Sequence, residues 1–190
     1  MNQHRRTIAA LAAGLVLASC AGVPIVGPAY YAVGYTPGEE RVAGVEMPVL
    51  VRGNPFAVPQ AEFDAEVTDA MQGWPFGLVL HFTPQGNPNA VYRVVMVFNP
   101  PAGVGDATYC IRPLPVQAVF GLAPGAARTP VNAVFCRGDG VLASAAGSLS
   151  TAGGPQSPDF RAGVGQFTAA LFPPRNPENQ PDHCSGGSDC

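Results

Sequence analysis

One stretch, residues 90–98 (AVYRVVMVF), limits the folds open to this chain more than any other. In an extended strand, successive side chains point to opposite faces. One face then carries Tyr92, Val94, Met96 and Phe98, and the other carries Val91, Arg93, Val95 and Val97. Because apolar side chains occupy both faces, the strand must be covered on both sides, and we expect it in the interior of a β-sheet.

Further strands are indicated by short runs of β-branched and aromatic residues that end in turn-forming residues. They span residues 47–52, 77–83, 107–112, 131–137 and 141–149. The turn-rich residues 84–89 predict a hairpin between 77–83 and 90–98, and Gly138-Asp139-Gly140 predicts another between the last two strands. Residues 116–120 fit either a strand or a helical turn. The final strand (VLASAAGSL) is built of small residues, so we expect bulky groups to pack on it.

Two helices are predicted by apolar side chains at helical spacing. The first spans residues 59–72, and its apolar stripe consists of Phe63, Val67, Ala70, Met71 and Trp74. The second spans residues 158–172, and its apolar stripe consists of Phe160, Val164, Phe167 and Leu171. Ser157 is suited to cap the second helix. Gly163 and Gly165 weaken that helix intrinsically, and we expect them to permit close approach to the small-residue strand.

Together these elements predict an α+β fold, an antiparallel sheet of about five to seven strands with two helices packed on one face. The chain is divided into a leader (1–19), a cysteine with a tether (20–46), a folded domain (47–172) and a polar, disordered tail (173–190). Tyr30, Tyr31 and Tyr35 interrupt the tether, and they suit either packing on the domain or contact with a membrane interface.

The N-terminal residues have the layout of a secretory signal. Arg5 and Arg6 precede a short apolar run at residues 8–18, and a small residue then precedes Cys20. The apolar run is too short to cross a bilayer as a helix. We therefore expect an exported chain from which residues 1–19 are removed.

The segment Leu17-Ala18-Ser19-Cys20 resembles the lipobox of bacterial lipoproteins. The resemblance covers residues 1–20, and the folded part resembles no domain family that we recognise. It implies cleavage before Cys20, a diacylglycerol thioether and an N-acyl group on that cysteine, and stable attachment to a membrane through these chains. The next residue is Ala21 rather than Asp, which in the enterobacterial sorting pattern implies the outer membrane, with the domain facing the periplasm.

The cysteines of the exported part predict disulfides, which are the default state of cysteine outside the cytoplasm. Apart from Cys20 they are Cys110, Cys136, Cys184 and Cys190. We favour Cys110 with Cys136, because both lie in predicted strands, and Cys184 with Cys190 in the tail. The acidic residues and His183 beside the tail cysteines suggest a metal site as an alternative, but their spacing matches no zinc template.

The charge pattern excludes several functional classes. All ten basic residues are arginines, which rules out a lysine Schiff base and a phosphate-binding loop that ends in lysine. Two of these arginines lie in the leader while all 13 acidic residues follow it, so the exported chain is acidic. It lacks the basic footprint of a nucleic-acid-binding protein. The sequence indicates no cofactor and no metal.

Candidate site residues are few. Four arginines lie in or at the ends of predicted strands, namely Arg52, Arg93, Arg112 and Arg137. If clustered, they form a site for an anionic glycan, a lipid head group or a partner carboxylate; if scattered, they form separate ion pairs. His81 could act as a base or ligand, although a structural role is the simpler interpretation. The remaining components of a hydrolase triad are present as residue types in Ser144, Ser148, Ser150, Asp106 and Asp139, but the Gly-x-Ser-x-Gly elbow is absent.

Two functions remain open from the sequence. The first is a non-catalytic binding or accessory lipoprotein of an envelope assembly, which predicts an envelope protein partner and an apolar or arginine-lined surface patch. The second is a small periplasmic hydrolase that uses His81 with an acid or a serine, which predicts a cleft around these groups. We favour the first, because the polar residue types used in catalysis are sparse.

Overall fold

The computed structural model of the protein describes residues 24–38, 46–75, 79–84, 87, 90–111 and 126–179. Within them, seven strands form one sheet in the order β1-β7-β6-β5-β3-β4, with β2 also paired to β7. The strands are β1 (Ile25–Val26), β2 (Tyr30–Tyr31), β3 (Glu46–Arg52), β4 (His81–Pro84), β5 (Tyr92–Phe98), β6 (Arg128–Arg137) and β7 (Gly140–Ser150). The helices are α1 (Gln60–Met71), α2 (Asp106–Cys110) and α3 (Pro158–Leu171), followed by the 3-10 helix η3 (Pro177–Asn179).

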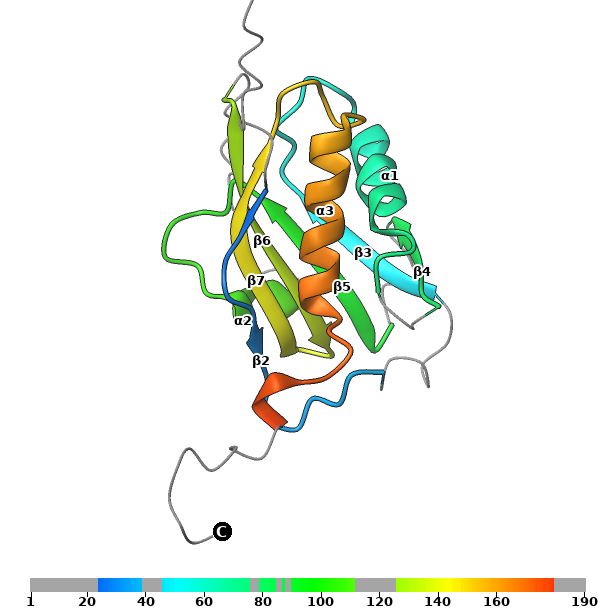
Figure 1. Ribbon diagram of the computed structural model, residues 1–190, viewed down its shortest axis with the longest axis vertical. Helices are drawn as coiled ribbons and strands as arrows, with labels where there is room; N and C mark the ends of the chain where they lie inside the picture. The colour runs from blue at the N-terminus through cyan, green and yellow to red at the C-terminus, as the bar shows by residue number, and fades with distance from the viewer. Residues whose placement is uncertain are drawn as a thin grey trace, which may run out of the picture.

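The fold class predicted from the sequence is confirmed. The helices α1 and α3 lie side by side on one face of the sheet, and the short α2 lies on the other (Figure 1). β3 pairs in parallel with β4 and β5, whereas the remaining strand pairs are antiparallel, so the sheet is mixed and mostly antiparallel. Among the described residues, no helix combines the length and apolar character needed to span a bilayer.

β5 occupies the interior position that its two apolar faces require, between β3 and β6. Val94 and Phe98 are fully buried in the main core, where the Phe98 ring centroid lies 4.9 Å from that of Phe63 in α1. Val95 and Val97 belong to a second buried cluster on the opposite face, which α2 covers. The covering of both faces was predictable from the two apolar rows of this strand.

The predicted hairpin between residues 77–83 and 90–98 is wrong. The first of these segments contributes only β4, which pairs in parallel with β3, and β3 separates β4 from β5. α1 connects β3 to β4, and a helical crossover returns the chain in the parallel direction. β4 is short, with an exposed His81 and a proline at position 84, which suits a sheet edge. The turn residues between β4 and β5 indicate a change of direction, but they do not select the strand's partner.

The strand predicted at residues 107–112 is also wrong, because the structure forms α2 there. Tyr109 is 3% exposed and its neighbour Cys110 is 0% exposed, so both side chains face the sheet. A strand would send adjacent side chains to opposite faces, whereas a helical turn can direct both inward. The Thr and Ile in this segment favour a strand locally, but burial of the two adjacent side chains decides the outcome.

The hairpin predicted at Gly138-Asp139-Gly140 is confirmed. β6 and β7 pair along their lengths, and Arg137 lies opposite Gly140 at the turn. Gly138 has a φ of 57°, a left-handed conformation that glycine adopts without the cost a Cβ would bring.

The apolar stripe of α3 is buried in full, as predicted. Phe160, Val164, Phe167 and Leu171 are each 0% exposed. The Ser157 hydroxyl caps the helix by accepting a hydrogen bond from the Phe160 amide at 3.3 Å. In α1, Phe63, Val67, Ala70 and Met71 are likewise buried, but Trp74, beyond the helix end, is 37% exposed.

The two glycines of α3 have different neighbours. A Cβ on Gly163 would lie 2.4 Å from Cδ2 of Leu149 in β7, so this glycine permits the close approach to the small-residue strand. A Cβ on Gly165 would lie 1.8 Å from the indole of Trp74, so this glycine makes room for the residue that follows α1. The expectation that both glycines face the strand holds only for Gly163.

Candidate functional site

Residues 24–35, called the strap below, lie along the edge of β7 instead of forming part of the predicted tether (Figure 1). β1 and β2 both pair antiparallel with β7. Between them the Gly27 amide donates a hydrogen bond to the Ala146 carbonyl, and after them the Ala32 amide donates to the Leu142 carbonyl, each at 2.8 Å. The strap therefore forms an edge strand of the sheet, and the predicted tether of residues 20–46 is wrong for this part.

Tyrosines hold the strap against the core. Tyr31 Oη donates a hydrogen bond to the Ala170 carbonyl of α3 at 2.7 Å, and burial raises the pKa of Tyr31 above its ordinary value. The Tyr35 ring is buried, with its centroid 5.9 Å from that of Phe135. Tyr30, by contrast, is 56% exposed. Of the two arrangements suggested by the sequence, Tyr31 and Tyr35 adopt packing on the domain.

The C-terminal segment closes over the end of the strap. Asn176 is buried, and its Nδ2 donates hydrogen bonds to the Tyr35 carbonyl at 2.8 Å and the Ala32 carbonyl at 3.4 Å. Its Oδ1 accepts a hydrogen bond from the Glu178 amide at 2.9 Å. The sequence predicts a disordered tail from residue 173, but residues 173–179 belong to the folded domain. Side-chain bonds of a single asparagine to a distant backbone cannot be read from the polar composition of this segment.

β7 accepts the strap because its side chains are small. A Cβ on Gly147 would lie 2.0 Å from the Ile25 carbonyl oxygen and 3.0 Å from Cζ of Phe167, so the strap and α3 approach this residue from different sides. On α3, a Cβ on Gly163 would lie 3.2 Å from Cβ of Pro24. The prediction that bulky groups pack on the small-residue strand is confirmed, and the strap was not foreseen as one of them.

The strap begins at one end of the domain, beside an open hollow of about 410 Å³. The residues that line the hollow are uncharged, and they are Pro55, Phe56, Ala57, Ala126, Ala127, Thr151 and Ala152. The Phe56 ring centroid lies 5.2 Å from that of Phe160 and 5.7 Å from that of Phe63, so the hollow rests on the main core. The Thr151 hydroxyl donates a hydrogen bond to the Ala126 carbonyl. We call Pro24, Ile25 and the lining residues the strap-entry end.

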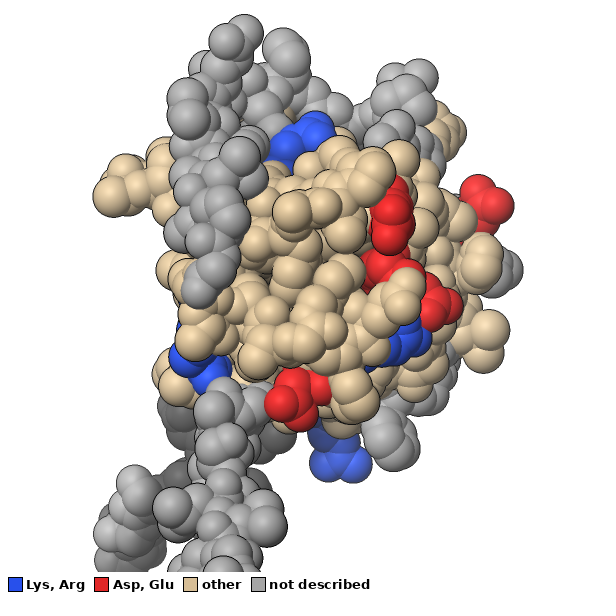
Figure 2. All heavy atoms as spheres, turned by 90° about the horizontal axis from the view of Figure 1, so that it is seen from above, with Lys and Arg blue, Asp and Glu red and all other residues tan. Residues whose placement is uncertain are grey.

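Figure 2 looks onto the strap-entry end of the molecule. Among the described residues, uncharged side chains fill the centre of this face, and a row of acidic side chains with a basic one lies on the face beside it (Figure 2). The side chain of Ile25 is 61% exposed beside this face. The face can therefore contact an apolar or interfacial surface without stripping water from a charged side chain at its centre.

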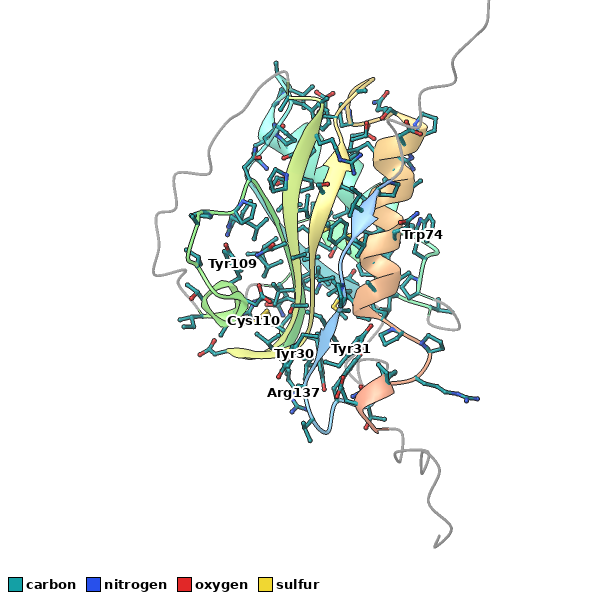
Figure 3. The ribbon with its side chains drawn as sticks, turned by 60° about the vertical axis from the view of Figure 1, so that its left-hand side comes forward. Tyr30, Tyr31, Trp74, Tyr109, Cys110 and Arg137 are labelled. Carbon is teal, nitrogen blue, oxygen red and sulfur yellow. A yellow bond between two sulfur atoms is a disulfide. The ribbon has the colours of Figure 1, made fainter. Side chains whose placement is uncertain are left out.

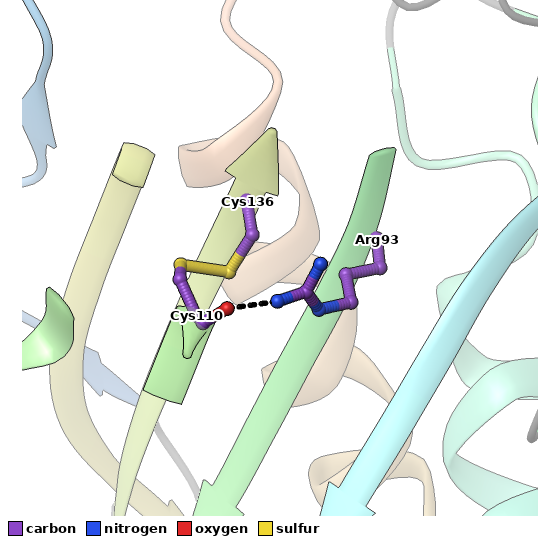
Figure 4. The surroundings of a disulfide bond; sticks show 3 residues. All are labelled: Arg93, Cys110 and Cys136. Carbon is purple, nitrogen blue, oxygen red and sulfur yellow. Dashed lines mark hydrogen bonds between the residues drawn. A yellow bond between two sulfur atoms is a disulfide. The ribbon is translucent and has the colours of Figure 1, made fainter. Parts of the chain in front are cut away.

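On the opposite face of the sheet, Cys110 and Cys136 form a disulfide, the pair that the sequence favours (Figures 3 and 4). The bond joins α2 to β6 over a Cα–Cα distance of 5.6 Å. The Arg93 guanidinium donates a hydrogen bond to the Cys110 carbonyl (Figure 4). Burial, and then the nearby Asp106 carboxylate, raise the pKa of Tyr109. Arg93 is only 2% exposed and both cysteines are 0% exposed, so this cluster stabilises the fold and offers no open surface to a ligand.

The structure does not gather the candidate arginines that it describes. Arg93 is buried under α2. Arg52 lies on β3 opposite Val97 of β5, and Val97 is about 13 Å along the strand from Arg93. Arg137 is exposed beside the hairpin turn, where strand alternation places it on the other face of the sheet from Arg93. Arg112 lies outside the described residues, as do Cys20, Cys184, Cys190 and His183.

The components of a hydrolase triad are also kept apart. His81 is exposed at the start of β4, opposite Glu46 of β3. Ser144, Ser148 and Ser150 lie on β7, four positions away in the strand order and so at about 19 Å. Asp106 lies in α2 within 3.5 Å of Asn132, and Asp139 is exposed in the hairpin turn. In the part of the chain that the structure describes, no three His, Cys, Asp or Glu side chains are grouped as metal ligands.

The strap and the strap-entry end were not predicted from the sequence. Two short apolar pairs, Ile25-Val26 and Tyr30-Tyr31, were the available signal for edge strands, but each is too short to show a period. The hollow is built from three loops that are far apart in the sequence, and no local pattern indicates that they meet.

Neither a protein-family model nor a curated protein matches the chain. Among solved structures, a dodecamer of a PelC variant from Paraburkholderia phytofirmans is similar with a TM-score of 0.45 at 12% identity, over 79% of this chain and 99% of the PelC chain. Another PelC dodecamer from the same organism is similar with a TM-score of 0.39 at 14% identity, over 68% of this chain and 89% of that one. These scores are low, so the likeness carries no argument about function.

Proposed function

We propose that this chain is a lipid-anchored lipoprotein of the cell envelope, with its domain facing the periplasm from the outer membrane. The domain works by non-catalytic binding, as an accessory member of an envelope assembly. The observation that carries the proposal is Leu17-Ala18-Ser19-Cys20 at the end of a secretory leader, with the lipid-bearing cysteine followed by Ala21.

The folded domain supports export. The Cys110–Cys136 disulfide is buried and links two elements that are 26 residues apart. A bond of this kind persists in an oxidising compartment and is rare in the cytoplasm. The fold is therefore suited to the compartment that the leader predicts.

A binding role is supported by the placement of the polar side chains. His81 and the serines of β7 lie near opposite edges of the sheet. The buried Arg93 guanidinium donates a hydrogen bond to the Cys110 carbonyl, which is consistent with a structural role. Large apolar side chains are instead exposed at several places on the surface, including Val33 at 95%, Val79 at 86% and Val91 at 58%. These exposed positions are where contact with another protein can be tested.

Lipid attachment is tested by metabolic labelling with an alkyne fatty acid, followed by membrane fractionation. Cys20→Ser should abolish the label and leave the protein in the leader-bearing form or in the soluble fraction. Ser19→Ala is the matched control, because it keeps a small residue before the cysteine and should be labelled normally. Equal labelling of the wild type and Cys20→Ser would disprove the proposal.

The partner is best sought by photo-crosslinking in intact cells. Amine-reactive reagents are unsuitable because the chain contains no lysine. A photoreactive amino acid is instead placed singly at Val33, Val79 or Val91, all of which are exposed. A binding role predicts an ultraviolet-dependent adduct of one defined mass at one of these positions, lost in the Cys20→Ser background. Adducts that form equally in that background would argue against a membrane-bound assembly.

A further inference from the structure

The strap fixes how far the domain can stand from its lipid. Pro24 is already placed against α3, and Ile25 is paired with β7. Only residues 21–23 separate Cys20 from Pro24. A fully extended chain advances at most about 3.3–3.6 Å per residue, so Cys20 lies within about 14 Å of Pro24.

The position of Pro24 on the domain shortens this distance further. Pro24 lies beside Gly163, which follows the first residue of α3, Pro158, by five positions. At 1.5 Å per residue, the level where α3 begins lies about 7.5 Å from Gly163, so a chain that runs to that level uses about 7.5 Å of this reach. It then has about 6 Å left before the cysteine. With so short a connection, a membrane that holds Cys20 lies close to the part of the domain around Pro24, which includes the strap-entry end.

We propose that the strap-entry end rests on the phospholipid surface in which Cys20 is anchored. This inference rests on the lipidation proposed above. The chemistry of the face fits a lipid surface, because the lining of the hollow consists of Pro, Phe, Ala and Thr side chains and Ile25 is exposed beside it. The charged side chains at this end include Arg128, whose guanidinium donates hydrogen bonds to Ser148, and the carboxylates of Glu62 and Asp159 on the first turns of α1 and α3. These groups must stay in the hydrated head-group region of the lipid surface.

The same geometry orients the rest of the molecule. α3 runs away from the strap-entry end, and the β6–β7 hairpin turn lies at the opposite end of the sheet (Figure 1). Asp139 in that turn and Val33 near the end of the strap are exposed and face away from the lipid. The surface left for a protein partner is therefore the far end and the flanks of the domain.

The test uses the full lipidated chain, with Cys184→Ser and Cys190→Ser, reconstituted into phosphatidylcholine vesicles that contain a nitroxide-headgroup lipid. A fluorophore is attached at Ala57→Cys or Ala152→Cys in the strap-entry end, or at Asp139→Cys as the far-end control. We expect quenching at the first two positions to be several-fold stronger than at the control. We also expect it to be insensitive to salt, because the contact is not built from charges.

A second variant tests the cause. Inserting a flexible Gly/Ser segment between Ala21 and Val23 should leave the protein on the vesicles but reduce quenching at Ala57→Cys toward the value of the far-end control. Intact mass and vesicle flotation are recorded for every sample. A protein without the lipid mass that fails to float contradicts the proposed lipidation. A protein that carries the lipid and floats, yet is quenched equally at both ends, contradicts this inference alone.

Discussion

Replacing Gly147 with alanine tests whether the strap is docked as the structure shows. The added Cβ would lie 2.0 Å from the Ile25 carbonyl oxygen and 3.0 Å from the Ile25 carbonyl carbon. Both are backbone atoms, so no side-chain rotation can relieve the conflict. It would also lie 3.0 Å from Cζ of Phe167, which limits movement of β7 toward α3.

The cost follows from the two ways of relieving this conflict. Moving β7 strains a filled core, and overpacking of this kind costs about 1–3 kcal/mol. Moving the strap instead gives up β1 pairing, including the Gly27 bond to Ala146, and each backbone hydrogen bond contributes about 0.5–1.5 kcal/mol net. Because the protein can release β1 before accepting further strain, we expect Gly147→Ala to lower the free energy of unfolding by about 1–3 kcal/mol. In a chain of this size, each kcal/mol lowers Tm by about 2–4 °C.

Urea unfolding of the Cys20→Ser chain measures this loss, and hydrogen exchange at the Gly27 amide shows where it arises. The matched control is Ala146→Ser, one residue earlier on β7, where the side chain is exposed; its effect should stay below about 0.5 kcal/mol. If Gly147→Ala unfolds like the wild type and Gly27 keeps its protection, the strap does not pack on β7 as described. The limit of about 14 Å between Cys20 and a docked Pro24 would then no longer hold.

Three further predictions concern the core, the disulfide and pH. Phe167→Ala should cost about 3–5 kcal/mol in denaturant unfolding, against less than about 0.5 kcal/mol for the exposed Gln166→Ala, because only the former opens a cavity under α3. Replacing both Cys110 and Cys136 with alanine should lower the free energy of unfolding by about 3–4 kcal/mol, because the disulfide closes a loop over 26 residues. Non-reducing peptide mapping of the wild type should find the two cysteines joined, and two free thiols would contradict the pairing. Burial raises the pKa of Tyr31 above its ordinary value of 10.0, so the unfolded chain loses its tyrosine proton first and stability should fall as the pH rises past that value. In urea unfolding on either side of about pH 10, Tyr31→Phe should reduce this fall of stability with pH. Below about pH 10 it should lower the free energy of unfolding by about 1 kcal/mol, because the hydrogen bond to Ala170 is lost. An unchanged pH dependence would argue against a buried Tyr31.

The parts of the fold that could be predicted from the sequence are those set by local periodicity. The two apolar rows of β5 required an interior strand, the stripe from Phe160 to Leu171 required a buried helix, and the glycines around Asp139 required a tight turn. Each of these signals lies within one element or one turn. Tertiary context could not reverse them without leaving large apolar side chains in water.

The parts that could not be predicted depend on which elements meet. The partner of β4 is set by the path of α1, which returns the chain to the free edge of β3. The helical form of α2 follows from burying Tyr109 and Cys110 together. The strap-entry end combines loops that only the finished fold brings together.

The strap joins two physical tasks in one segment. Without it, β7 would end the sheet as a long, exposed edge strand of small residues, a surface prone to pairing with other chains. With it, β7 pairs along this edge with residues that follow Cys20 by only a few positions in the sequence. Under the proposed lipidation of Cys20, a longer connection at residues 21–23 should free the domain from the lipid surface while leaving the edge of β7 covered. Loosening the strap itself should free the domain and also expose that edge.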